Sequence, residues 1–212
     1  MNHYLIPLFP LNVVVCPQGL MPLRIFEARY LDMVKNCLRN QSAFAIVTVL
    51  PQAQASANNH FPFTDVGTSV LITEADVSTV GLMMIRCVGQ HRVKVESFTQ
   101  QSDGLVIGKV SDIANDVELP IPEDVQITSS SLQRLLKALP EQGISPNDMP
   151  VIQPYKFNDA SWVANRWVEL LDLPLLQKQR LMQMDSPILR LEMINDILDS
   201  NLLDSNNLGK SI

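Results

Sequence analysis

The spacing of apolar residues changes near residue 115, and this change limits the folds open to the chain. Up to Ile113 the sequence consists mainly of short runs rich in β-branched and aromatic residues, with the clearest alternation at residues 92–96. Beyond Pro122 the apolar residues recur at helical spacing. The two patterns in succession predict an α+β protein, in which several short strands form a barrel or sandwich and helices follow.

The first part contains one predicted helix among its strands. The strand-like runs are residues 13–16, 44–50, 66–73, 82–88, 92–98 and 105–110. Gly89-Gln90-His91 and Ser102-Asp103-Gly104 lie between such runs and suit hairpin turns. The polar segment 52–63 is expected to be a long mobile loop. A helix is predicted over residues 26–39 because its apolar residues share one face: Phe26, Tyr30, Met33, Val34, Cys37 and Leu38.

The second part reads as a helical bundle. Its first helix is expected at residues 123–139, with Pro140 as its stop. A second helix, capped by Asn158 or Ser161, would reach residue 171. A third would run from near Pro174 to residue 184, and a fourth would start with Ser186 as cap. We therefore predict a β-rich lobe at 1–118, a helical bundle at 119–205 and a disordered tail at 206–212.

Composition narrows the class of protein further. The chain is 46% hydrophobic and 18% charged, which suits a buried core, and its apolar runs are too short to span a membrane. Its 3 cysteines are widely spaced among apolar neighbours, as is typical of reduced thiols. No signal peptide is visible. These features predict a cytoplasmic protein without a membrane segment.

Charge argues against nucleic acid as a partner. Residues 1–110 hold 8 Lys and Arg against 7 Asp and Glu, whereas residues 111–212 hold 8 against 15. An acidic second half repels a phosphate backbone, and nucleic-acid binding usually relies on a basic patch.

The motifs of common enzymes and metal sites are missing. His3, His60 and His91 lie far apart, and no cysteine pair has metal-ligand spacing. Gly209-Lys210-Ser211 is only the end of a phosphate-binding loop, and no serine lies in a Gly-x-Ser-x-Gly turn. We predict no catalytic residue, no metal and no cofactor. A hydrolase with a serine-lysine pair that meets only in the fold stays open.

The amino-terminal stretch carries the most specific pattern. It reads Pro-Leu-Phe-Pro-Leu at residues 7–11 and Pro-Leu-Arg-Ile-Phe-Glu-Ala-Arg-Tyr at residues 22–30. This stretch resembles the opening of the Lon protease amino-terminal domain family. Residues 66–68, 81–83 and 88–95 are similar to later strands of that family, and residues 173–179 and 185–191 are similar to the helical end of its short stand-alone members.

The resemblance implies a PUA-like β pseudo-barrel followed by helices. In full Lon proteases this region helps to recognise unfolded or tagged substrates, and ATPase and Ser-Lys protease domains follow it. The resemblance therefore implies a stand-alone, non-enzymatic module that binds unfolded or extended polypeptide or a partner protein. The sequence does not specify an oligomeric state. The alternative is a PUA-like module for a small ligand or RNA, with a cleft lined by Arg24, Arg29, Arg86, Arg92 and Lys94.

The candidate binding residues form a short set near the predicted helix start, with one residue from a later strand: Arg24, Phe26, Arg29, Tyr30 and Arg92. A structural role competes with the binding role for each residue. Phe26 and Tyr30 could belong to the buried stripe of the helix, and Arg24 could form an ion pair with Glu27.

Overall fold

The structure, a computed structural model, describes residues 3–50, 62–79 and 81–208. The chain divides into two compact units. The first unit is Met1–Asn115 with Pro174–Gln179, and the second is Asp116–Leu173 with Arg180–Ile212. Most of the predicted mobile loop, residues 52–61, lies outside the described residues. Its last predicted residue, Phe63, is instead a buried strand residue.

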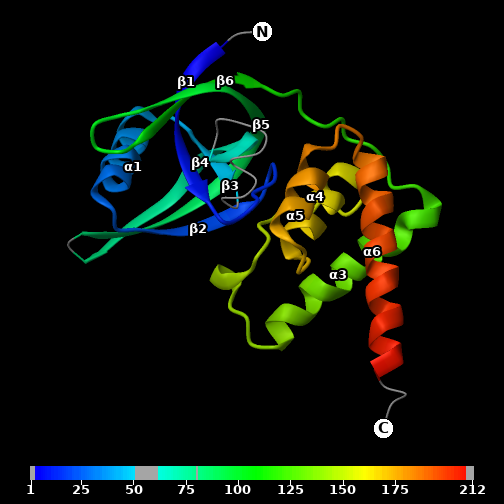
Figure 1. Ribbon diagram of the computed structural model, residues 1–212. Helices are drawn as coiled ribbons and strands as arrows, with labels where there is room; N and C mark the ends of the chain where they lie inside the picture. The colour runs from blue at the N-terminus through cyan, green and yellow to red at the C-terminus, as the bar shows by residue number, and fades with distance from the viewer. Residues whose placement is uncertain (1–2, 51–61, 80, 209–212) are drawn as a thin grey trace. The chain divides into compact units, whose positions relative to one another are not determined.

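Six strands of the first unit form one sheet that returns on itself (Figure 1). They are β1 (His3–Leu11), β2 (Leu20–Ile25), β3 (Phe44–Val49), β4 (Phe63–Thr79), β5 (Leu82–Gln100) and β6 (Val106–Asp112). Their order is β2-β5-β4-β3-β1-β6, and β5 also pairs with β6. All pairings are antiparallel except β1 with β3. The α+β class is confirmed, and the arrangement is compatible with the predicted pseudo-barrel.

The strand β5 is long enough to serve two parts of the sheet. Its first half pairs with β2, and its second half pairs with β6. The inward side chains accordingly form two apolar clusters. One contains Ile6, Val93 and Val110, and the other gathers side chains of β2, β4 and β5 against helix α1 (Ala28–Asn40).

Helix α1 buries only part of the apolar face that the sequence predicts. Tyr30, Met33, Val34 and Cys37 are buried. Phe26 lies before the helix and is 69% exposed, and Leu38 is 41% exposed. The expectation that Phe26 belongs to the buried stripe is therefore wrong, because the helix begins only at Ala28.

Two local expectations about strands and turns are wrong as well. Residues 13–16 form no strand, and the Val15 carbonyl accepts a hydrogen bond from the hydroxyl of Thr68. Gly89-Gln90-His91 is no turn, because β5 continues through it. A Cβ at Gly89 would overlap the carbonyl oxygen of Cys16. The backbones at residues 16 and 89 can therefore lie this close because residue 89 is a glycine.

The predicted turn at Ser102-Asp103-Gly104 is confirmed. It connects β5 to β6, and the Leu105 amide donates to Asp103 Oδ1 at 2.9 Å. Gly104 has a φ of 86°, a conformation that glycine adopts without a steric penalty.

The second unit is helical. Its elements are η1 (Glu123–Val125), α3 (Gln126–Glu141), η2 (Pro146–Asp148), α4 (Ala160–Leu170) and α6 (Pro187–Leu208), with α5 (Leu175–Gln183) shared between the units. Ser186 accepts from the Leu189 amide at 3.3 Å, as its predicted capping role requires. None of the helices in the described ranges is long and apolar enough to cross a bilayer.

The helix ends differ in three places from the sequence-based expectation. Pro140 lies inside the last turn of α3 and does not stop the helix. Asp159, not Asn158 or Ser161, caps α4, because its carboxylate accepts from the Ser161 amide at 3.0 Å. Helix α6 continues to Leu208, so the first residues of the predicted disordered tail are helical, and the last four lie outside the described residues.

Candidate functional site

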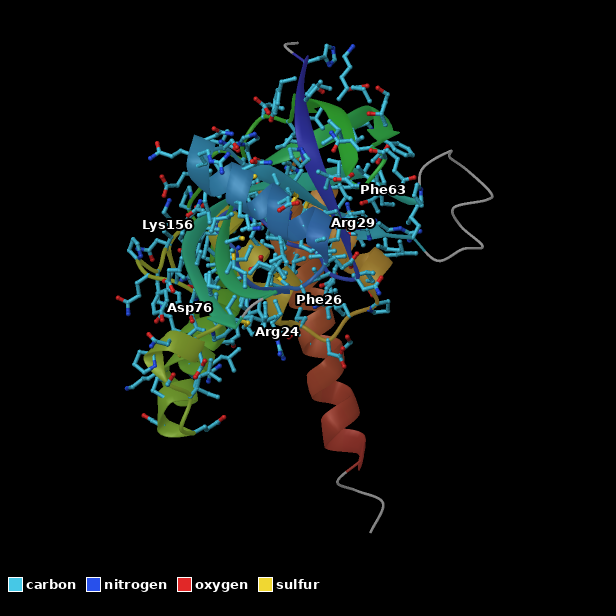
Figure 2. All side chains as sticks on the ribbon, turned by 90° about the vertical axis from the view of Figure 1, so that its left-hand side faces the viewer. Arg24, Phe26, Arg29, Phe63, Asp76 and Lys156 are labelled. Carbon is cyan, nitrogen blue, oxygen red and sulfur yellow. The ribbon has the colours of Figure 1, made fainter. Side chains whose placement is uncertain are left out.

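Four of the five predicted site residues lie close together in the chain, between the end of β2 and the start of α1. Arg24 is exposed near the end of β2, and Phe26 is exposed just beyond it. Figure 2 shows both side chains near the amino end of α1, with Arg29 on the first turn of that helix. Arg24 and Phe26 are therefore available to a ligand in this structure.

Tyr30 and Arg29 have mainly structural contacts. The Tyr30 ring is buried against Phe9, with ring centroids 4.1 Å apart. Arg29 Nη2 pairs with Glu27 Oε2 at 2.6 Å, its Nη1 donates to the Gly104 carbonyl at 3.1 Å, and its guanidinium carbon lies 4.7 Å from the centre of the Tyr30 ring. Arg29 thus forms the ion pair with Glu27 at the start of the helix. The sequence had suggested Arg24 for this ion pair.

Arg92 is not brought to this surface. It is only 3% exposed, and its Nη2 donates to the carbonyl of Ala114 at 3.4 Å. A side chain this buried cannot line a solvent-exposed groove, so the structure separates Arg92 from the other predicted residues. Sequence alternation could not reveal this burial, because it gives the side of a strand but not what covers that side.

The exposed pair borders a sheet surface that the sequence does not single out. Strands β2, β5 and β4 carry side chains that face away from α1, and the strand register places them in three rows. The rows are Leu20, Val88 and Leu71; then Pro22, Arg86 and Glu74; then Arg24, Met84 and Asp76. We call this surface the outer sheet face.

The outer sheet face mixes apolar and charged groups. Leu71 and Met84 are each 36% exposed, and Arg86 Nη1 lies 3.6 Å from Glu74 Oε2. With Phe26 at 69% exposure, large apolar side chains meet solvent along this face. A surface with exposed apolar groups framed by charges is typical of a binding site for another macromolecule. Only the β pairing reveals it, because Leu71 and Met84 lie on different strands.

A polar cluster joins three other strands. Tyr4 on β1 donates to Asp112 Oδ1 at 2.6 Å, and His91 Nε2 on β5 lies 2.9 Å from the same oxygen. Burial and the bond to Asp112 raise the pKa of Tyr4 above its ordinary value, so its phenol stays protonated. The cluster links β1, β5 and β6, and we interpret it as a structural tie.

The thiols and the acidic groups do not suggest a reactive centre. Cys16, Cys37 and Cys87 form no disulfide bond and are buried, and burial raises the pKa of Cys87 to about 12 and also raises that of Cys37. Thiols with such pKa values stay protonated and are poor nucleophiles. Over the described ranges, no group of three or more His, Cys, Asp or Glu side chains could hold a metal ion.

The match to a family covers most of the chain. A sequence model of the ATP-dependent protease La (LON) substrate-binding domain matches residues 5–200. The chain belongs to the Lon substrate-binding domain family. No ATPase or protease domain is evident within the 212 residues. The resemblance stated from the amino-terminal pattern is confirmed.

Solved structures of Lon amino-terminal domains agree with this assignment. The crystal structure of a Lon N-terminal domain protein from Xanthomonas campestris is 30% identical, with a TM-score of 0.71, over 90% of this chain and 96% of that one. The N-terminal domain of a Mycobacterium avium complex Lon protease is 15% identical, with a TM-score of 0.59, over 91% and 97% of the two chains. The second likeness shows a shared fold alone. No curated protein matches this chain.

Proposed function

We propose that this Lon-domain protein binds extended or unfolded polypeptide on the outer sheet face and leaves it chemically unchanged. The observation that carries the proposal is the exposure of Phe26 at 69% beside a sheet surface that also exposes Leu71 and Met84. Covering such side chains with the apolar groups of an unfolded chain removes apolar surface from water. The description of the family as a substrate-binding domain supports the same function.

The charges of this unit favour polypeptide over RNA. Five basic residues were candidates for the lining of a basic cleft, and three of them lie beside carboxylates. Arg29 pairs with Glu27. Arg86 lies near Glu74, and Lys94 pairs with Asp65. Arg92 is buried. Paired and buried cations leave little positive surface to release counterions from a phosphate backbone, so an RNA-binding function has no specific observation in its favour.

The test compares two exposed apolar residues of the same unit. Phe26→Asp removes the most exposed of the three apolar groups named for the proposed site, at its border, whereas Leu5→Asp changes a leucine on β1 that is 72% exposed. A fluorescently labelled, reduced and carboxymethylated polypeptide serves as the unfolded ligand, and anisotropy reports its binding. We expect the Kd to rise about tenfold or more for Phe26→Asp and to stay unchanged for Leu5→Asp.

Three results would contradict the proposal. The wild-type protein could fail to bind the unfolded polypeptide at high micromolar concentration. The two aspartate variants could lose affinity equally, which would indicate a general effect of charge. RNA could bind in a salt-dependent manner where polypeptide does not, which would favour the alternative module. Circular dichroism of both variants serves as the control for folding.

A further inference from the structure

The strand β2 has one free backbone edge. It stands at the end of the sheet order, and β5 is its single neighbour among the described strands. Its register with β5 runs from Leu20 opposite Val88 to Ile25 opposite Met83. The side of β2 away from β5 is therefore an edge of the kind that can accept another strand.

One hydrogen bond tells which residues of β2 face that edge. The Gly89 amide donates to the Gly19 carbonyl at 2.9 Å, so this carbonyl is turned toward β5, whereas the Gly19 amide donates to the Cys16 carbonyl in the preceding turn. The Leu20 N–H belongs to the same trans peptide unit as the Gly19 carbonyl and therefore points away from β5. In an antiparallel pair, the N–H and C=O of one residue point to the same side, and the side alternates along the strand. Leu20, Pro22 and Arg24 therefore turn their backbone groups toward the free edge.

The position of Pro22 agrees with this alternation of backbone directions along β2. Proline has no N–H, so within a sheet it is placed where no donor to a neighbouring strand is lost. In the part of the chain that the structure describes, the backbones of Leu20, Pro22 and Arg24 have no hydrogen bond on that side. The edge thus offers the N–H groups of Leu20 and Arg24 and the carbonyls of all three residues.

The side chains at this edge indicate what an added strand should carry. Arg24 is exposed, and among the described residues it has no ion-pair partner. Phe26 follows two residues later and is exposed as well. Side chains that oppose each other on neighbouring strands lie close enough to interact, and opposite charges there stabilise the pairing.

We propose that the free edge of β2 accepts a segment of extended polypeptide as an added strand, with a carboxylate opposite Arg24 and an apolar side chain beside Phe26. The inference rests on the proposed function and adds to it the mode of binding and the preferred ligand: one strand of the ligand lies at the border of the outer sheet face, beside Arg24 and Phe26, and not over Leu71 and Met84. Main-chain hydrogen bonds would give affinity for many sequences, and Arg24 and Phe26 would select among them.

The first experiment tests the backbone pairing with the full chain. Twelve-residue peptides that tile a carboxymethylated unfolded protein are screened, and the tightest is remade with a single N-methyl group at each position in turn. Methylation should weaken binding about tenfold or more at every second position across the paired segment, because only alternate N–H groups point at β2. A uniform or absent effect of methylation would overturn the inference.

The second experiment changes the edge itself. Pro22→Thr supplies the missing N–H, and we expect it to tighten peptide binding about threefold to tenfold. Arg24→Glu should weaken peptides with a carboxylate at the paired position and tighten the same peptides with lysine there. Unchanged or weaker binding by a folded Pro22→Thr variant would contradict the added strand, and equal preference for both peptides by the Arg24 variant would contradict the charge selection.

The outcomes separate the two proposals. If no peptide binds, the proposed function fails and this inference fails with it. If peptides bind in a manner that depends on Phe26 but show no alternation on methylation, only the inference fails. A wild-type dimer in sedimentation velocity that Arg24→Glu dissociates and peptide does not would also overturn it, because a second copy would then occupy the edge.

Discussion

Thr48 on β3 donates its hydroxyl to the side-chain oxygen of Gln179 on α5 at 2.8 Å, across 131 positions of the chain. The amide nitrogen of Gln179 in turn donates to the Val66 carbonyl at 2.8 Å. Gln179 is 3% exposed, so both ends of its amide are satisfied inside the protein. These bonds help to explain why Pro174–Gln179 belongs to the strand-built unit although it lies in the helical part of the sequence.

Loss of this amide should destabilise the strand-built unit. Gln179→Ala leaves the Thr48 hydroxyl and the Val66 carbonyl without these bonds, and we expect the free energy of unfolding to fall by about 1–3 kcal/mol. Urea denaturation followed by circular dichroism measures the change. The exposed Gln133→Ala on α3 is the matched control and should change stability by less than about 0.5 kcal/mol. Equal stability of the two variants would show that the buried bonds contribute nothing.

A buried ion pair should be important for the helical unit. Arg190 Nη1 lies 2.8 Å from Asp116 Oδ2, and it also donates to Asn165 Oδ1 at 2.7 Å. Asp116→Ala leaves the Arg190 cation buried without its carboxylate, which should cost about 3–5 kcal/mol. Both tryptophans, Trp162 and Trp167, lie in this unit, so their fluorescence during urea denaturation reports its stability.

The control for this pair is the contact between Lys156 and Glu118. These groups lie 3.9 Å apart, and the Glu118 side chain is 73% exposed. Glu118→Ala should change stability by less than about 1 kcal/mol, because water screens an exposed pair. A loss in Asp116→Ala no larger than in Glu118→Ala would contradict the role of the buried pair.

The cap of α4 should give the helical unit a pH dependence. Burial raises the pKa of Asp159 above its ordinary value of 3.8, although the bond from Ser161 opposes this shift. The folded state then holds the proton more tightly than the unfolded state, so this group adds stability at acid pH and loses that contribution as the pH rises from 3.8 through the folded pKa. Asparagine caps helices as well as aspartate but does not titrate.

We therefore expect Asp159→Asn to gain stability relative to the wild type as the pH rises from about 4 toward neutral. The measurement is the free energy of unfolding from tryptophan fluorescence at a series of pH values. A difference between the two proteins that is constant with pH, or that moves in the opposite direction, would show that Asp159 has no raised pKa. Asp159→Ala should cost about 1 kcal/mol because the cap is lost.

Gly89 should tolerate no side chain. A Cβ at this position would overlap the Cys16 carbonyl oxygen, which belongs to backbone and cannot rotate away. Gly89→Ala should lower the stability by about 1–3 kcal/mol, as overpacked sites do. Gly81 is the contrasting site. Its φ is 83°, and a Cβ at this position would have no other atom within 4 Å. Gly81→Asn should cost less than about 1 kcal/mol in thermal unfolding, and a larger loss there than at Gly89 would refute this explanation.

The sequence alone determined the α+β class, the early helix and the turn at Asp103-Gly104, because each depends on neighbours within a few residues. Periodicity locates an apolar stripe, and Asp-Gly tolerates the backbone angles of a turn. The order of several short motifs was enough to indicate the family as well. Long-range contacts leave no such local signal. The burial of Arg92 and the role of Gln179 both depend on what the rest of the fold places against them.

In the candidate site, too, the sequence indicated some features and the tertiary structure decided others. The amino-terminal pattern drew attention to Arg24 and Phe26, and both are exposed. Their surroundings were decided by strand pairing, which places Met84 beside Arg24 and leaves one side of β2 without a neighbour. Pairing depends on which distant strands meet, and a side chain on a strand has no fixed environment until its neighbours are in place. The local chain therefore specified the residues, and the pairing of distant strands specified the surface they form.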